Sequence, residues 1–184
     1  LNLERYLSGT TRLWVATTSV VTGEARYFYI DDKNIHDVLT ASCSIPLAYR
    51  DYPIVENEPM SDGGIADSIP VAEAYRRGAR DITVVLSRPL GYQKKPLAFP
   101  ALTKRMFREQ PGLAEALIRR GERYNETLEF IRNPPDDCRL RIIAPPEDFP
   151  VSRLTTDLNK LDLGYQQGHR AAMAYLADMA REVA

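Results

Sequence analysis

An acidic residue beside two glycines is the feature of this sequence that is best suited to chemistry. Asp62 is followed by Gly63 and Gly64, and Pro70 comes six residues later. Glycine permits positive φ and close approach of other groups, so a carboxylate here could be held near a reacting atom. A carboxylate so held can take a proton from a nucleophile. Because Asp-Gly also forms simple hairpin turns, the pattern by itself leaves a structural role for Asp62 open.

The segments before Asp62 predict strands and a helix that could position it. Residues 12–18 and 25–30 are rich in aromatic and β-branched residues and are separated by a short turn, which predicts a β-hairpin. We assign Trp14 to the core. Apolar residues recur at helical spacing over 34–44, which predicts a short helix that ends before a proline.

The segments after Asp62 predict a helix followed by a buried strand. Pro70 suits the first turn of a helix, and Gly78 suits its C-terminal end. The apolar run 82–86 is typical of a parallel strand that is covered on both faces. We therefore expect an α/β fold with a central, mostly parallel sheet flanked by helices, and a single domain over 1–184.

The remainder of the chain contains two longer helical patterns. Apolar positions keep one face of a helix over 113–131, and a strand is predicted over 139–143. The last helix is predicted from about Asp162 to the C-terminus, and its apolar stripe includes Tyr165 and Leu176. The sequence contains no run of about 18 apolar residues, so it predicts no helix that spans a membrane.

The region around Asp62 resembles a known family. The sequence Asp62-Gly63-Gly64, with Asp67 and Pro70 and the strand 82–86 after it, is similar to the acidic motif of patatin-like phospholipases. Residues 41–46 resemble the helix end that precedes this motif in the family. Further similarity to the bacterial branch lies at 124–125, 142–145 and 160–168.

The resemblance implies an α/β-hydrolase-like architecture with a Ser–Asp dyad and no catalytic histidine. Asp62 would be the dyad acid, and Gly63 and Gly64 would support the motif. The family's serine lies in a Gly-x-Ser-x-Gly elbow that follows a glycine-rich oxyanion loop, and residues 1–184 contain neither element. We therefore expect the chain to be the C-terminal part of a longer patatin-like domain. The 184 residues alone are expected to be inactive.

The function predicted from this resemblance is a serine acyl-ester hydrolase that acts on lipids or related esters, as a phospholipase does. The alternative is a non-catalytic patatin-like binding or scaffold domain. A nucleotide-binding α/β domain is disfavoured because no glycine-rich phosphate loop is present. The net charge of -1 gives no reason to expect nucleic acid as a partner. We expect no cofactor and a cytoplasmic protein, with peripheral membrane contact as an option.

Other carboxylates and both cysteines have simpler interpretations. Asp67 is predicted to cap the helix that follows it. A metal site formed by Glu58, Asp62 and Asp67 matches no known ligand spacing and is disfavoured. Cys43 and Cys138 are far apart in the sequence and are expected to be free thiols.

The alternative nucleophiles and bases lie on predicted helices. His36 and His169 are the only histidines, and neither has a local pattern that supports a catalytic triad. Ser42 and Ser44 lie at the C-terminal end of a predicted helix, whose dipole disfavours an oxyanion. We expect both histidines to be ordinary helix residues.

Residues 94–108 hold five basic residues and no acidic one. Apolar side chains are interleaved with the cations: Phe99, Leu102, Met106 and Phe107. Such a segment could contact an anionic lipid surface. It could also pack its apolar side on the core while its cations stay solvated, and the sequence favours this second interpretation.

Overall fold

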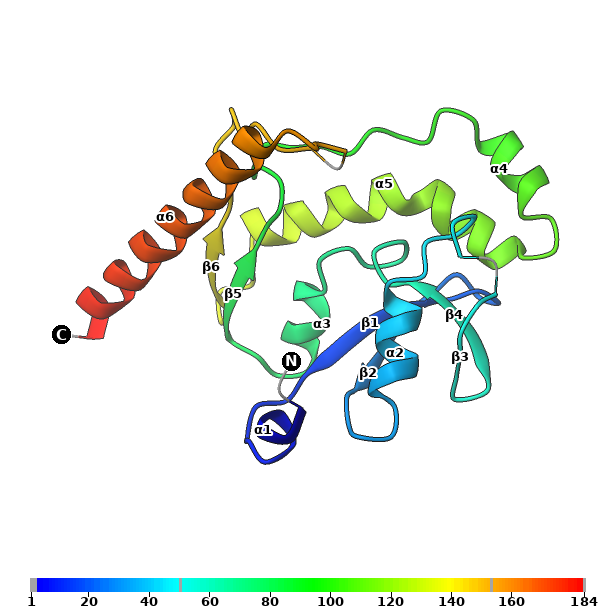
Figure 1. Ribbon diagram of the computed structural model, residues 1–184, viewed down its shortest axis with the longest axis horizontal. Coiled ribbons are helices and arrows are strands. Elements are labelled where there is room, and N and C mark those ends of the chain that lie inside the picture. The colour runs from blue at the N-terminus through cyan, green and yellow to red at the C-terminus, as the bar shows by residue number, and fades with distance from the viewer. Residues whose placement is uncertain (1–2, 50, 153, 184) are drawn as a thin grey trace. The chain divides into compact units, whose positions relative to one another are not determined.

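The structure is a computed structural model that describes residues 3–49, 51–152 and 154–183 (Figure 1). The chain forms two compact units. The first unit comprises Leu1–Pro70 and Lys94–Thr127, and the second comprises Val71–Gln93 and Leu128–Ala184. The elements in chain order are α1 (Leu3–Leu7), β1 (Trp14–Ser19), β2 (Ala25–Tyr29), α2 (Ile35–Ser42), β3 (Ile54–Val55), β4 (Glu58–Asp62), α3 (Val71–Arg76), β5 (Asp81–Val85), α4 (Pro100–Met106), α5 (Pro111–Arg132), β6 (Arg139–Ile143) and α6 (Leu158–Val183).

The sheet of the first unit has the strand order β2-β1-β4-β3, and every neighbouring pair is antiparallel. The predicted hairpin is confirmed, since β1 pairs with β2 from Trp14 opposite Tyr29 onward. β4 pairs with the other edge of β1, so that Thr17 lies opposite Asp62. This pairing places the acidic residue on a strand with a neighbour on each side.

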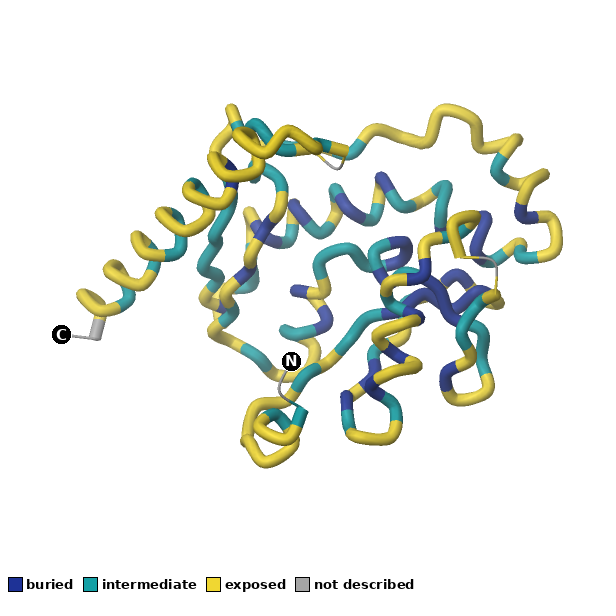
Figure 2. Tube along the Cα trace, viewed as in Figure 1, coloured by how far each residue is buried: buried dark blue, intermediate teal, exposed yellow. Residues whose placement is uncertain are grey.

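One hydrophobic core of the first unit forms where α2 packs against the sheet. α2 buries Ile35, Val38 and Ala41, whose spacing of three residues keeps them on one helix face. They pack with sheet residues that include Phe28 and Met60. Figure 2 shows buried positions concentrated in β1 and β4. The helix predicted over 34–44 is thus confirmed, although it is shorter at both ends.

A second core joins the start of α5 to the same unit. Leu113 and Ala116 from α5 are buried together with Val20, Ile65 and Phe107. Leu113 is fully buried, which removes an apolar side chain from water at a gain of about 1.5–3 kcal/mol. The helix predicted over 113–131 is confirmed, and its first turns help to hold the chain around Ile65.

Trp14 is not a core residue. Its side chain is 43% exposed, and its ring lies 5.7 Å from that of Tyr29, its cross-strand neighbour. The pair lies at the open end of the β1–β2 hairpin, and Tyr29 is also exposed. The prediction that Trp14 belongs to the core was wrong because residue type indicated burial while position at a strand end prevented it.

The second unit contains a two-stranded parallel sheet formed by β5 and β6, in register from Asp81 opposite Arg139 to Val85 opposite Ile143. Both strands were predicted, but the burial on both faces that was expected of 82–86 is not found, because only Val84 is buried within β5. α3 precedes β5 and ends as expected, because Gly78 adopts a φ of +97° that closes the last turn.

A buried carboxylate on α3 forms ion pairs with two arginines. Glu73 is buried and accepts hydrogen bonds from Arg76 (2.7 Å) and Arg77 (2.5 Å). Burial raises the pKa of Glu73, but the hydrogen bonds and positive charges of the two arginines outweigh it. The net effect is a lowered pKa.

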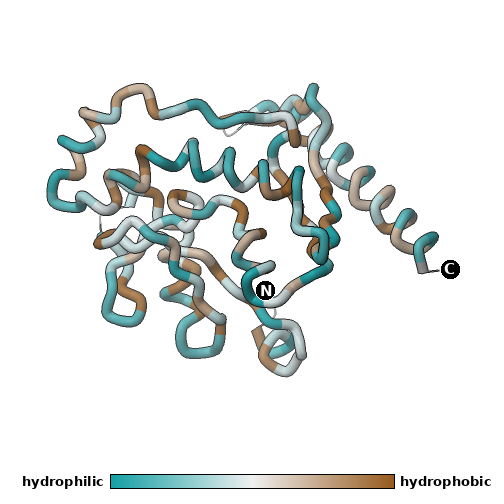
Figure 3. Tube along the Cα trace, turned by 180° about the vertical axis from the view of Figure 1, so that it is seen from behind, coloured by the Kyte–Doolittle hydropathy of each residue, from teal (hydrophilic) through white to brown (hydrophobic). Residues whose placement is uncertain are grey.

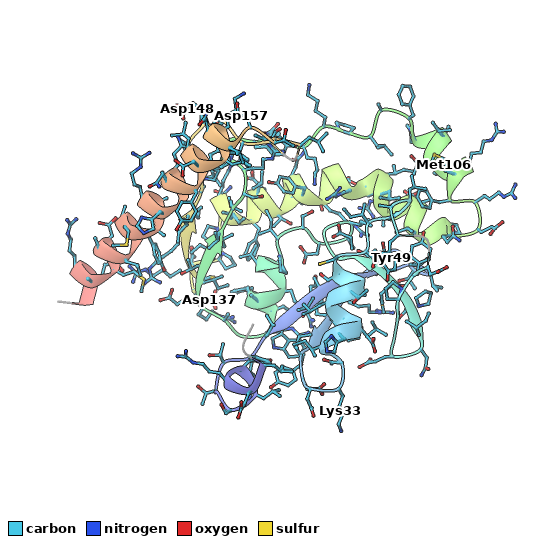
Figure 4. The ribbon with its side chains drawn as sticks, in the orientation of Figure 1. Lys33, Tyr49, Met106, Asp137, Asp148 and Asp157 are labelled. Carbon is cyan, nitrogen blue, oxygen red and sulfur yellow. The ribbon has the colours of Figure 1, made fainter. Side chains whose placement is uncertain are left out.

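α6 begins earlier than predicted. Asp157 accepts backbone hydrogen bonds from Asn159 (2.9 Å) and Lys160 (3.4 Å), which caps the helix at its first turn (Figure 4). The predicted apolar stripe is largely exposed, with Tyr165 at 69% and Leu176 at 56%. The periodicity therefore identified the helix but not a buried face.

The described residues form a mixed α/β fold, as predicted. The expected central, mostly parallel sheet is not confirmed, because the larger sheet is antiparallel and, among the strands of the described residues, only β5 and β6 pair in parallel. Within the described part of the chain, no helix is long and apolar enough to cross a membrane.

Candidate active site

Asp62 lies at the end of β4, where the strand gives way to a tight turn. Its backbone N–H donates to the Ser44 carbonyl at 3.0 Å, and the Ser61 hydroxyl donates to the same carbonyl at 2.8 Å. The end of β4 is thus tied to the residues that follow α2. The turn continues with backbone hydrogen bonds from Ile65 to Asp62 and from Asp67 to Gly63.

Gly63 is required by close packing rather than by an unusual φ. Among the described residues, positive φ occurs at other glycines but not at Gly63 or Gly64. A Cβ atom at Gly63 would overlap the carbonyl oxygen of Ala16 in β1. Absence of a side chain therefore lets the turn lie against the backbone of the neighbouring strand, which is one of the two roles expected of these glycines.

One oxygen of the Asp62 carboxylate is anchored. Oδ1 accepts the backbone N–H of Gly64 at 2.7 Å. Asp62 is half-buried, and no serine or threonine hydroxyl of the described residues donates to its carboxylate. The group is therefore oriented by the turn and retains acceptor capacity for a further donor.

Two side chains hold the turn that orients Asp62. The buried Thr18 hydroxyl donates to the Asp62 carbonyl at 2.8 Å and accepts the Ala66 N–H at 3.1 Å. Arg120 of α5 donates from Nε to the Gly64 carbonyl at 2.7 Å. A Cβ at Gly64 would lie 3.1 Å from Asp62 Oδ1 and 3.6 Å from Arg120 Nη2, so both charged groups flank this residue.

Thr17 is the residue directly opposite Asp62 in the sheet. Its side chain is fully buried, and its Oγ1 has no hydrogen-bond partner among the described residues. Residues opposite each other on antiparallel strands place their side chains on the same face. A buried hydroxyl without a partner is uncommon, and here it occurs beside the candidate catalytic carboxylate.

Asp67 does not cap α3, contrary to prediction. Its carboxylate accepts the Tyr27 hydroxyl at 2.5 Å and the Ile69 N–H at 3.2 Å. α3 begins only at Val71, beyond the reach of these bonds. Asp67 thus joins the far end of the turn to β2, which stabilises the segment that carries Asp62.

The hydroxyl groups of Ser42 and Ser44 donate hydrogen bonds to backbone carbonyls. The Ser42 hydroxyl donates to the Ala16 carbonyl at 2.9 Å, and the Ser44 hydroxyl donates to the Thr40 carbonyl at 2.6 Å. Ser44 is also only 1% exposed. Neither hydroxyl donates to Asp62, so the described residues bring no nucleophile to this carboxylate.

The histidines lie on helix surfaces, as predicted. His36 is exposed on α2 and His169 is exposed on α6. The described residues contain no cluster of three or more His, Cys, Asp or Glu side chains that could hold a metal ion. Glu58 instead pairs with Arg26 at 3.3 Å and accepts the Ser19 hydroxyl.

The segment 94–108 exposes most of its apolar side chains. Phe99 is 71% exposed, Leu102 is 53% exposed and Met106 is 51% exposed, whereas Phe107 alone of the four predicted residues is buried. Figure 3 shows hydrophobic and hydrophilic positions alternating along this segment. The interpretation that its apolar side packs on the core therefore holds only for Phe107.

Comparison with known proteins supports a patatin-type interpretation of the site. Residues 12–75 match the family model described as "Patatin-like phospholipase", and this range includes Asp62 and its turn. Residues 110–183 match the model described as "Domain of unknown function (DUF6363)".

A similar protein occurs in Escherichia coli strain K12. The chain is 30% identical over 156 residues to this protein, named "Uncharacterized protein YjjU". The alignment covers 84% of this chain and 44% of the relative. The chain therefore spans less than half the length of the relative that it matches.

Sequence reasoning proposed Asp62, Gly63 and Gly64 as site residues but did not predict the residues that hold them. Thr18 and Arg120 contact the turn from 44 and 56 residues away in the chain. The register between β1 and β4 places Thr17 opposite Asp62. No local pattern indicates these contacts, although the buried β-branched run of β1 was visible as a strand.

Proposed function

We propose that this chain is part of a serine acyl-ester hydrolase of the patatin-like phospholipase type, with Asp62 as the acid of a Ser–Asp dyad. The observation that carries the proposal is the state of the Asp62 carboxylate. Gly64 orients it through a backbone hydrogen bond, on a turn that the side chains of Thr18 and Arg120 hold in place. The match of residues 12–75 to the phospholipase model supports this assignment.

The chemistry needs a serine within hydrogen-bond reach of Asp62. As the serine oxygen attacks the ester carbonyl carbon, Asp62 accepts the hydroxyl proton. The proton then passes to the departing alkoxide, which leaves an acyl-enzyme. Asp62 next accepts a proton from water as the water oxygen attacks the acyl carbon. Asp62 then returns this proton to the departing serine oxygen, which releases the carboxylic acid and restores the serine hydroxyl and the Asp62 carboxylate. Separate hydrogen-bond donors must stabilise the oxyanion in both steps.

We further propose that the serine and the oxyanion loop lie in sequence outside these 184 residues, within one longer patatin-like domain. Residues 1–184 contain no Gly-x-Ser-x-Gly elbow. The second unit supports this proposal, because within the described residues β5 and β6 form a two-stranded parallel sheet and Val85 is 72% exposed. Parallel sheets are normally larger and covered on both faces, so additional strands are expected here.

The proposed substrate is a lipid or related acyl ester, and the proposed location is the cytoplasm at a membrane surface. Support for membrane contact comes from the exposed apolar residues of 94–108, which stand among five cations. Apolar side chains enter the interface while cations attract anionic headgroups. This arrangement would bring the enzyme to its substrate.

The alternative is a patatin-like scaffold without activity. It is favoured by one observation, namely that no described nucleophile contacts Asp62. The two proposals are separated by assaying short-chain ester hydrolysis in a protein that carries the additional segment, with and without Asp62→Asn. Loss of turnover in the variant supports the hydrolase, and equal rates remove Asp62 from the mechanism.

A further inference from the structure

The second unit contains a cavity of about 670 Å³ at the carboxyl ends of β5 and β6. Small-molecule sites commonly have volumes of about 300–1,000 Å³. Crevices outside the carboxyl ends of parallel strands are also the usual ligand sites of open α/β sheets. The lining is predominantly apolar and includes Leu86, Ile143, Phe149 and Val151.

α6 borders this cavity with small residues that do not fill it. Gly164 packs closely, since a Cβ there would come within 3.4 Å of the Phe149 ring and closer still to Val151. Gly168, one turn later, borders the cavity, and a Cβ there would meet no atom within 4 Å. Ala172 continues this face. The helix is therefore anchored at one turn and leaves open space beside the next two.

Arg88 is the charged side chain in the lining. Its guanidinium lies 5.4 Å from the centre of the Tyr92 ring, and no carboxylate of the described residues forms an ion pair with it. The neighbouring Glu147 lies outside the lining and accepts the Gly91 N–H at 3.3 Å. The cavity thus combines a long apolar wall with one cation at which a carboxylate can bind through paired hydrogen bonds.

We propose that this cavity binds a long-chain fatty acid. The acyl chain lies between the strand ends and α6, beside Gly168 and Ala172, and the carboxylate is held by Arg88. A neutral lipid would leave the guanidinium without a counter-charge. This inference goes beyond the proposed hydrolase, because binding requires neither Asp62 nor a nucleophilic serine.

The test is displacement of the fluorescent fatty acid cis-parinaric acid from the 184-residue chain by palmitate, below the concentration at which palmitate forms micelles. Ala172→Phe fills the cavity and is expected to weaken palmitate binding by about tenfold or more, since one tenfold step corresponds to about 1.4 kcal/mol. Ala174→Phe is the matched control, because Ala174 is exposed on the same helix and does not line the cavity. It should leave the affinity unchanged, and circular dichroism verifies that α6 is retained.

Arg88→Gln tests the headgroup. It should weaken palmitate by about tenfold while leaving the weaker binding of hexadecanol unchanged, because only palmitate uses the charge. Unsaturable binding, or equal affinities for palmitate in the wild type and Ala172→Phe, overturns the proposed site. Tighter displacement by hexadecyl phosphate than by palmitate overturns the carboxylate assignment. The assay involves no hydrolysis, so its failure is distinct from failure of the dyad.

Discussion

Replacing Thr18 by valine should loosen the turn that carries Asp62, whereas the same change at Thr17 should not. Both side chains are fully buried on β1, so the two substitutions are matched in burial and chemistry. Thr18 Oγ1 makes two hydrogen bonds, to the Asp62 carbonyl and from the Ala66 N–H. Thr17 Oγ1 makes none with the described residues.

The expected magnitudes follow from these partners. Thr18→Val leaves the buried Ala66 N–H without an acceptor, while the Asp62 carbonyl keeps its bond from Ile65. An unsatisfied buried donor costs about 1–3 kcal/mol, so a loss of about 2–3 kcal/mol in the free energy of unfolding is expected. Thr17→Val removes an unpaired hydroxyl and should be neutral or stabilising by about 1 kcal/mol.

The assay is urea unfolding of the 184-residue chain and its two variants, followed by tryptophan fluorescence of Trp14 in β1. The two variants should differ by about 3 kcal/mol, which corresponds to about 6–12 °C in Tm for a chain of this size. Equal destabilisation by both changes would refute the reasoning. It would mean that the Thr17 hydroxyl contributes as much to the free energy of unfolding as the Thr18 hydroxyl does, or that the two Thr18 hydrogen bonds contribute nothing.

Three further outcomes are expected. Gly63→Ala should lose about 1–3 kcal/mol of stability by thermal unfolding, because its Cβ would overlap a β1 carbonyl, whereas Gly168→Ala on α6 should gain up to about 1 kcal/mol. Since the pKa of Glu73 is lowered on folding, its contribution is present above the ordinary pKa of about 4.3 and is lost as the pH falls through the folded value. Urea titrations should therefore show the destabilisation by Glu73→Gln shrinking between about pH 5 and pH 3, and a constant difference would contradict this. A Phe99→Ser, Leu102→Ser double variant should bind phosphatidylglycerol vesicles at least about tenfold more weakly in sedimentation assays, and unchanged binding would exclude 94–108 as the contact.

Local signals were sufficient for much of the fold. The β1–β2 hairpin follows from two β-rich runs around a short turn, and α3 ends where Gly78 supplies a positive φ. The face of α5 follows from apolar spacing that begins at Leu113. Each of these features depends on residues close together in the chain.

Features that depend on distant residues were not predictable. The antiparallel pairing of β1 with β4 joins Thr17 to Asp62, and no pattern in either strand specifies that register. Asp67 has the residue type and position of a helix cap, yet its carboxylate accepts a hydrogen bond from the hydroxyl of Tyr27, which lies 40 residues away in the chain. Trp14 has a residue type that favours burial, yet it is 43% exposed at the first position of β1.

The candidate site also combines a feature that is local in the sequence with contacts from distant residues. The dyad assignment for Asp62 depended on a local motif and its resemblance to a family. The support that orients the carboxylate comes from Thr18 and from Arg120 of α5, which only the tertiary structure brings to the turn. A candidate motif can thus be visible in a sequence while the residues that position it are not.

The central claim is that Asp62 is the proton acceptor of a Ser–Asp dyad. Its most direct test is the kcat for p-nitrophenyl butyrate hydrolysis by a protein that includes the proposed serine segment, compared with Asp62→Asn and Asp67→Asn. Asp67 is the matched control, because it lies in the same turn but accepts the Tyr27 hydroxyl. The dyad predicts that Asp62→Asn lowers kcat by about 10²–10⁴-fold while Asp67→Asn retains most of the rate. Equal activity of Asp62→Asn and the wild type would contradict the claim.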